Sequence, residues 1–101
     1  MDPQTRTVTV SNPQGLHARP AHLLVQLATR FKSNILIGKD SELVDCKSIL
    51  SLLTLGAGQG TELSITAQGS DAVEAVESIV QLIEADFDDT KMQGMEPSVD
   101  S

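Results

Sequence analysis

The sequence predicts an α+β domain in which helices cover one face of an antiparallel sheet. Stretches where apolar and polar residues alternate, typical of half-buried strands, are interspersed with stretches whose apolar residues recur every three to four positions, typical of helices. Their order is strand, helix, strand, strand, helix, strand, helix, which lacks the strict alternation of a parallel α/β sheet. The 101 residues, 40% of them hydrophobic, suffice for one domain with its own core.

The first predicted strand covers residues 5–10, where threonines lie on one face and valines on the other. Residues 11–15 contain proline and glycine and are expected to form a loop. A helix is predicted over residues 18–31, with Pro20 in its first turn, where the missing N–H costs no hydrogen bond. The apolar stripe of this helix consists of Leu23, Leu24, Leu27, Ala28 and Phe31.

A β-hairpin is expected next, because two short β-branched or apolar runs at residues 34–37 and 42–45 flank a turn at residues 38–41. The mostly apolar residues 48–55 suit a short helix, which a group of three closely spaced glycines then ends. The two elements together predict a strand pair followed directly by a helix.

The fourth strand is predicted over residues 61–68, again from alternation. The final helix begins at Ser70 or Asp71, and Asp71 stands at capping-box spacing from Glu74. Its apolar stripe consists of Ala72, Val76, Ile79, Val80 and Ile83. The helical pattern therefore predicts a second amphipathic helix that covers the sheet.

The predicted domain comprises residues 1–87, because the apolar pattern stops at about Phe87. Residues 88–101 are acidic and are expected to form a flexible tail. We expect removal of the chain after Asp86 to cost little stability.

Charge and composition exclude several classes of function. Six of the 14 acidic residues lie from Glu84 onward, so most of the net charge of −7 belongs to the C-terminal end. The rest is near neutral and lacks the basic stripe of a nucleic-acid-binding protein. No apolar stretch is long enough to span a membrane. The single cysteine, Cys46, excludes an internal disulfide and a CxxC metal site, and a reducing cytoplasm is the expected compartment.

The segment that carries chemistry is Gly15-Leu16-His17-Ala18-Arg19-Pro20. A glycine-bearing loop delivers His17 to the start of a helix, whose first N–H groups lack intrahelical acceptors and favour an anion. Arg19 adds a guanidinium that can bind phosphate oxygens. An imidazole beside such a cradle can hold a phosphoryl group on a ring nitrogen. The alternative is that His17 is only a solvated or capping residue.

This segment resembles the phosphorylation-site motif of HPr, the histidine-containing phosphocarrier of the bacterial sugar phosphotransferase system. Lys47-Ser48-Ile49, Leu53-Thr54-Leu55-Gly56 and Gly60-Thr61-Glu62-Leu63 resemble the second signature of the family, around its regulatory serine. The resemblance covers roughly residues 5–86. It implies the HPr open-faced β-sandwich, with a four-stranded antiparallel sheet in the order 1-4-2-3 and three helices on one face.

The resemblance also implies a function. His17 would accept phosphate on Nδ1 from phosphoenolpyruvate through enzyme I and donate it to enzyme IIA domains, while Arg19 would stabilise the phosphate. Such a protein is a cytoplasmic carrier and not an enzyme, needs no cofactor or metal, and is expected to be a monomer. Ser48 would correspond to the serine that HPr kinase phosphorylates, although serine is also an ordinary helix N-cap.

The runner-up function is a regulatory HPr paralogue that signals through Ser48 or His17, in a nitrogen-branch or kinase pathway, without sugar transport. A docking patch for partners is expected from Ala21, Leu24, Lys47, Leu50 and Leu53, although core packing explains some of these residues equally well. Which sugar and which IIA partner are involved does not follow from the residues.

Overall fold

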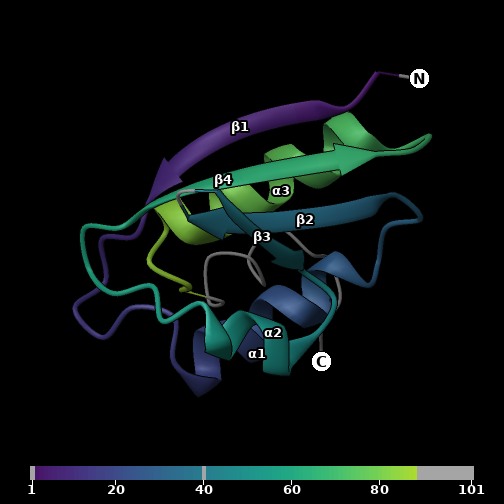
Figure 1. Ribbon diagram of the computed structural model, residues 1–101. Coiled ribbons are helices and arrows are strands. Elements are labelled where there is room, and N and C mark those ends of the chain that lie inside the picture. Colours follow the sequence, from purple (N-terminus) through teal and green to yellow (C-terminus); the bar gives the residue numbers. More distant parts are fainter. Residues whose placement is uncertain (1, 40, 89–101) are drawn as a thin grey trace.

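The computed structural model describes residues 2–39 and 41–88, which form a four-stranded sheet and three helices (Figure 1). The elements in chain order are β1 (Gln4–Thr9), α1 (Ala18–Ala28), β2 (Asn34–Lys39), β3 (Glu42–Asp45), α2 (Ile49–Thr54), β4 (Glu62–Gln68) and α3 (Ala72–Glu84). The strand order is β1-β4-β2-β3, all neighbours are antiparallel, and the helices lie on one face. The predicted fold class and strand order are therefore confirmed.

Alternation along the strands separates the two faces of the sheet. Val8 pairs with Leu63, and Ile37 pairs with Ile65, and all four side chains are buried toward the helices. On the opposite face, the hydroxyls of Thr5 and Thr66 lie 3.2 Å apart. Because successive side chains of a strand point to opposite faces, the polar residues between the buried ones leave the second face of the sheet open to water.

The β2–β3 hairpin is tighter than predicted. Gly38 and Lys39, expected in the turn, belong to β2 and pair with Leu43 and Glu42. A Cβ on Gly38 would lie 1.8 Å from the carbonyl oxygen of Glu42, so the close approach of β3 requires glycine there. Asp40, also expected in the turn, lies outside the described residues.

Helix α1 ends at Ala28, three residues before its predicted end. The N–H of Arg30 donates to Leu27 O at 3.1 Å, and the N–H of Phe31 donates to Ala28 O at 3.2 Å. Bonds to the third preceding carbonyl tighten the chain into a turn, so the helical period ends while Phe31 still packs partly buried against the core.

The apolar stripe of α3 is buried as predicted, but its start differs. Asp71 is the N-cap residue, yet its side chain makes no capping hydrogen bond. Its carboxylate instead accepts hydrogen bonds from the N–H of Lys32 at 2.8 Å and from the N–H and hydroxyl of Ser33. These bonds lower the pKa of the Asp71 carboxyl, the Ser33 hydroxyl contributing most. The predicted capping box with Glu74 is therefore wrong, because Asp71 fastens the α1–β2 connection.

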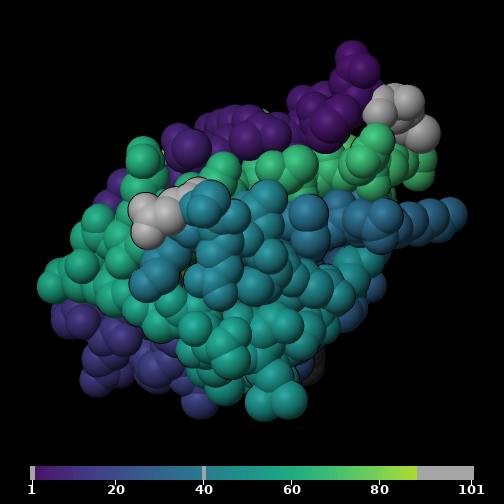
Figure 2. Space-filling model, viewed as in Figure 1, coloured from purple at the N-terminus to yellow at the C-terminus, as the bar shows by residue number. Residues whose placement is uncertain are grey.

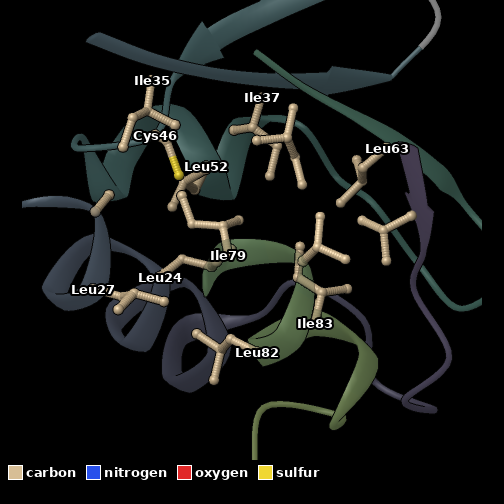
Figure 3. Close-up of a cluster of buried hydrophobic side chains, with 14 of the residues drawn as sticks. Leu24, Leu27, Ile35, Ile37, Cys46, Leu52, Leu63, Ile79, Leu82 and Ile83 are labelled. Atoms are coloured by element: carbon tan, nitrogen blue, oxygen red, sulfur yellow. The ribbon is translucent and has the colours of Figure 1, made fainter. Parts of the chain in front are cut away.

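The core lies between the sheet and the helices. Figure 3 shows Ile35, Ile37 and Leu63 pointing from the strands toward Ile79 and Ile83 of α3, and these side chains are fully buried. Leu24 and Leu27 of α1 reach the same cluster (Figure 3).

Cys46 lies in this core, which raises the pKa of its thiol to about 12, chiefly because burial disfavours the thiolate. The residue is therefore a small apolar filler, and burial outweighs the neighbouring charge of Lys47.

Phe87 is buried, which argues against the expectation that removal of the chain after Asp86 costs little stability. Asp88 is exposed, and residues 89–101 of the predicted tail lie outside the described residues. Within residues 2–39 and 41–88, no helix has the length and apolar character needed to cross a bilayer.

Candidate functional site around His17

The loop between β1 and α1 is closed by a local turn. The N–H of Gly15 donates to Asn12 O at 3.1 Å, and the side-chain amide of Asn12 donates back to Gly15 O at 2.9 Å. The Asn12 side chain is buried, so both bonds lie inside the loop and not at its surface. The turn therefore has a fixed shape immediately before His17.

A second loop, which follows α2, packs against this turn. The N–H of Leu16 donates to Ala57 O at 2.8 Å. Gly15 has a left-handed φ of +67°, and a Cβ there would lie 2.4 Å from Ala57 O and 2.7 Å from the Cα of Gly58. Only glycine meets both conditions. Loop composition predicted a glycine-bearing loop here, but nothing in it indicated the contact with Ala57.

His17 is the N-cap residue of α1, with an extended backbone (φ −97°, ψ −166°). Its backbone N–H donates to Gly15 O, and its carbonyl accepts from the N–H of Ala21, both at 3.0 Å. Its side chain is exposed and makes no capping hydrogen bond, so the imidazole stands in solvent at the positive end of the helix.

The first turn of α1 is suited to an anion. It contains no acidic side chain, and the first N–H groups of a helix have no intrahelical acceptor. Arg19 is exposed in this turn, and Pro20 is buried beside it. Because proline stands within the first turn, its missing N–H removes no helical hydrogen bond. The predicted site residues His17 and Arg19 therefore share one helix end.

Ser48 is the N-cap residue of α2, and its hydroxyl accepts a hydrogen bond from the N–H of Ser51 at 3.3 Å. The side chain of Lys47 is half-buried, and its ammonium donates to the carbonyl oxygen of Phe31 at 2.8 Å. Ser48 thus has a structural role at the start of α2, and Lys47 connects the segment before α2 to the turn that follows α1.

Some residues of the expected docking patch are buried in the structure and others are exposed. Ala21 and Leu24 are fully buried and pack in the core, so their side chains cannot contact a partner, and this part of the prediction is wrong. Leu50 and Leu53 are exposed, at 73% and 38%, and Ile49 joins them at 36%.

We call Ile49, Leu50 and Leu53 the α2 patch. Their spacing places them on one side of the helix, away from the buried Leu52. Helices α1 and α2 contact each other, and Figure 2 shows the teal residues of α2 at the surface beside the dark blue residues of the α1 region.

The family model described as the PTS HPr component phosphorylation site matches residues 4–85. This range includes all seven elements and residues 11–17 between β1 and α1, which we call the His17 loop. The chain belongs to the HPr family. This family consists of phosphocarriers of the phosphotransferase system, which agrees with the resemblance seen in the sequence.

Several HPr proteins are similar over most of their length. The phosphocarrier protein HPr of Treponema pallidum is 42% identical over 84 residues, which are 83% of this chain and 96% of that protein. A crystal structure of HPr from Thermoanaerobacter tengcongensis has 43% identity and a TM-score of 0.80, and the match covers 83% of this chain and 94% of the other.

The HPr-like protein Crh has almost the same sequence identity to this chain. Crh of Bacillus subtilis is 43% identical over 77 residues, 76% of this chain and 91% of that protein. Its crystal structure is described as a dimer with a swapped domain, and it matches with 42% identity and a TM-score of 0.67 over 78% of this chain and 91% of the other. The relatives of this chain therefore include both a phosphocarrier HPr and Crh proteins at almost the same sequence identity.

Proposed function

We propose that this HPr-family protein carries phosphoryl groups on His17, from phosphoenolpyruvate through enzyme I to enzyme IIA domains of the sugar phosphotransferase system. One observation supports this above all others. The imidazole of His17 is exposed at the start of α1 and makes no capping hydrogen bond, and it lies within the residues that match the HPr phosphorylation-site model. An unobstructed nucleophile beside an anion-favouring helix end is what reversible phosphorylation requires.

The proposed reaction balances without a cofactor or metal. The lone pair on Nδ1 of His17 attacks phosphorus on phosphorylated enzyme I, and the N–P bond forms as the bond from phosphorus to the donor breaks. A nucleophilic side chain of the enzyme IIA domain then attacks the same phosphorus, the N–P bond breaks, and its electron pair returns to Nδ1 as the lone pair of the neutral imidazole. Arg19 and the N-terminus of α1 stabilise the phosphate charge in the intermediate. Because one protein phosphorylates His17 and another removes the phosphate, and this chain converts no substrate of its own, it acts as a carrier and not as an enzyme.

Both partners are proposed to dock on the α2 patch. Leu50 is the most exposed large apolar side chain of the patch, at 73%, and α2 contacts the helix that begins at His17. Leu50→Asp should therefore raise the KM for phosphorylation by enzyme I about fivefold to tenfold. Val73→Asp is the matched control, because Val73 is 59% exposed on α3. Equal effects of the two changes would argue against docking through α2.

A regulatory function is the second candidate, and two observations favour it. Crh is about as identical in sequence to this chain as carrier HPr is, at 43% against 42%, and Ser48 caps α2 next to the α2 patch. Phosphate on Ser48 would add negative charge beside that surface. The intact His17 argues against a paralogue that signals through serine alone.

Ser48→Asp tests this second candidate, because aspartate keeps an N-cap acceptor and adds the charge. We expect the same unfolding temperature and weaker binding to enzyme I, whereas Ser48→Ala should weaken the helix cap without adding charge. If Ser48→Asp binds enzyme I with unchanged affinity, this residue has no regulatory role of the proposed kind. A kinase assay with HPr kinase would then show whether Ser48 is a substrate.

The deciding experiment for the carrier function is incubation with phosphoenolpyruvate and enzyme I, followed by intact-mass analysis before and after acid. We expect one added phosphate that is lost in acid, as a phosphohistidine would be. His17→Ala should abolish this addition, and His22→Ala is the matched control, because His22 is exposed on the same helix. If His17→Ala still accepts phosphate, His17 is not the phosphoryl acceptor.

Transfer to an enzyme IIA domain, measured with the phosphorylated protein, would separate sugar transport from regulation. We propose that the carrier acts as a monomer in the cytoplasm, where enzyme I takes phosphate from phosphoenolpyruvate. Light scattering on the purified chain tests the oligomeric state, and a dimer would point to the behaviour described for Crh of Bacillus subtilis.

A further inference from the structure

Asp86, the residue after the C-cap of α3, stands at a position where glycine is the usual residue. The N–H of Asp86 donates to Ile83 O at 3.0 Å, and the N–H of Phe87 donates to Leu82 O at 2.9 Å. These two bonds are those of a Schellman motif, with Asp86 in the left-handed position after the C-cap Ala85. Asp86 has φ 56° and Phe87 has φ 59°, a conformation that is unfavourable for residues with a Cβ.

The ring of Phe87 explains why this ending is stable. Phe87 is only 6% exposed and belongs to the core cluster, together with Leu82 at the motif's hydrophobic contact position. Burial of the ring holds residues 85–87 in place. It does not explain the aspartate, because glycine at position 86 would permit the same turn with less backbone strain.

The Asp86 side chain has a partner far away in the sequence. Its carboxylate accepts a hydrogen bond from the hydroxyl of Ser11, which lies two residues after Thr9, the last residue of β1. The carbonyl oxygen of Ser11 also accepts a hydrogen bond from the side-chain amide of Gln59, at 3.0 Å. Ser11 is therefore held both by α3 and by the loop that precedes β4.

Ser11 is where the His17 loop begins. From it the chain passes through the Asn12–Gly15 turn and then through Leu16, whose N–H is bonded to Ala57 O. The loop is thus attached to its surroundings at its start and just before His17. Backbone strain that is kept where a less strained residue would serve is commonly found at functional sites.

We propose that Asp86 is a positioning residue for the His17 loop: its carboxylate, held by the left-handed turn and the buried Phe87, fixes Ser11 and thereby the orientation of His17. The inference rests on the proposed phosphocarrier function. It goes beyond the family match, which ends at residue 85. Asp86 touches neither phosphate nor partner in this proposal and acts only through Ser11.

Asp86→Gly tests the proposal in the full chain, because glycine removes the carboxylate and suits the left-handed turn. We expect the unfolding temperature to stay the same or rise. The kcat/KM for phosphorylation by enzyme I should nevertheless fall about threefold to tenfold, the size of one lost hydrogen bond. Ser11→Ala should give a similar loss, and the double variant no further loss, since both remove one interaction.

Two further variants serve as controls. Asp86→Asn keeps an acceptor for the Ser11 hydroxyl and tolerates the left-handed conformation, so it should retain most of the activity. Glu84→Gln removes a carboxylate from the last turn of α3 without removing the Asp86–Ser11 bond, and it should leave the rate unchanged. A purely structural role of Asp86 predicts no loss of rate in Asp86→Gly.

Amide hydrogen exchange at Leu16 provides a readout that does not depend on phosphorylation. Loss of positioning should speed exchange of the Leu16 N–H in Asp86→Gly and Ser11→Ala but not in Glu84→Gln. If the parent protein takes no phosphate, the proposed function fails, and faster Leu16 exchange still supports the role of Asp86 in the loop. Parent-like exchange at Leu16 together with parent-like kcat/KM in Asp86→Gly would overturn the proposal.

Discussion

Gly15→Ala is the sharpest test of how the His17 loop is held. Gly15 has φ +67°, which costs about 1–2 kcal/mol for a residue with a Cβ. The new Cβ would also lie 2.4 Å from Ala57 O, so one of the two loops must move. Displacement strains the packing by about 1–3 kcal/mol, and loss of the Leu16–Ala57 hydrogen bond adds about 1 kcal/mol.

We therefore expect Gly15→Ala to lower the free energy of unfolding by about 3–6 kcal/mol, measured by urea denaturation. Gly56→Ala is the matched control, because Gly56 has φ +62° but no atom within 4 Å of the added Cβ. It should lose only about 1–2 kcal/mol, from backbone strain alone. Equal losses in the two variants would refute the conclusion that contact with Ala57 requires glycine at position 15.

Three further predictions concern stability and reactivity. The pKa of Asp71 is lowered below its ordinary value of 3.8, so its stabilisation is present above that pH and is lost as the pH falls through the folded-state pKa. Asp71→Asn should therefore lower the unfolding temperature more at neutral pH than near pH 2. The same difference in unfolding temperature from the parent at both pH values would contradict this. Cys46 should react with an aromatic disulfide reagent only as fast as the protein opens, because burial raises the pKa of its thiol to about 12, and rapid labelling of the folded protein would count against it. Phe87→Ala should cost about 3 kcal/mol of unfolding free energy in urea, whereas truncation after Asp88 should cost little; similar small effects of both would show that the Phe87 ring contributes no stability.

The start of α3 shows how far a local pattern predicts a contact. Asp71 and Glu74 have capping-box spacing, and Asp71 is indeed the N-cap residue. Its carboxylate, however, bonds to Lys32 and Ser33, which are 39 and 38 residues away. Spacing along one helix contains no information about which distant N–H groups fold against its end.

The docking surface likewise depended on contacts that a local pattern does not contain. The helical period of α1 correctly indicates one apolar stripe, but it does not tell a buried stripe from an exposed one. Ala21 and Leu24 are covered by the other elements, while Leu50 remains exposed because the six-residue α2 buries only Leu52 fully against the core. Exposure is therefore a property of the packed elements and not of the helix that carries the residue.

Alternation, helical period and loop residues act between near neighbours, so they predict the order of the elements, the fold class and the place of His17 and Arg19 at a helix start. The contacts that hold the His17 loop follow from the packed structure alone: Ala57 against Gly15, and Asp86 at Ser11 across 75 residues of chain. Such contacts depend on how the sheet and helices pack together. Their partners are set by three-dimensional proximity, which no local spacing records.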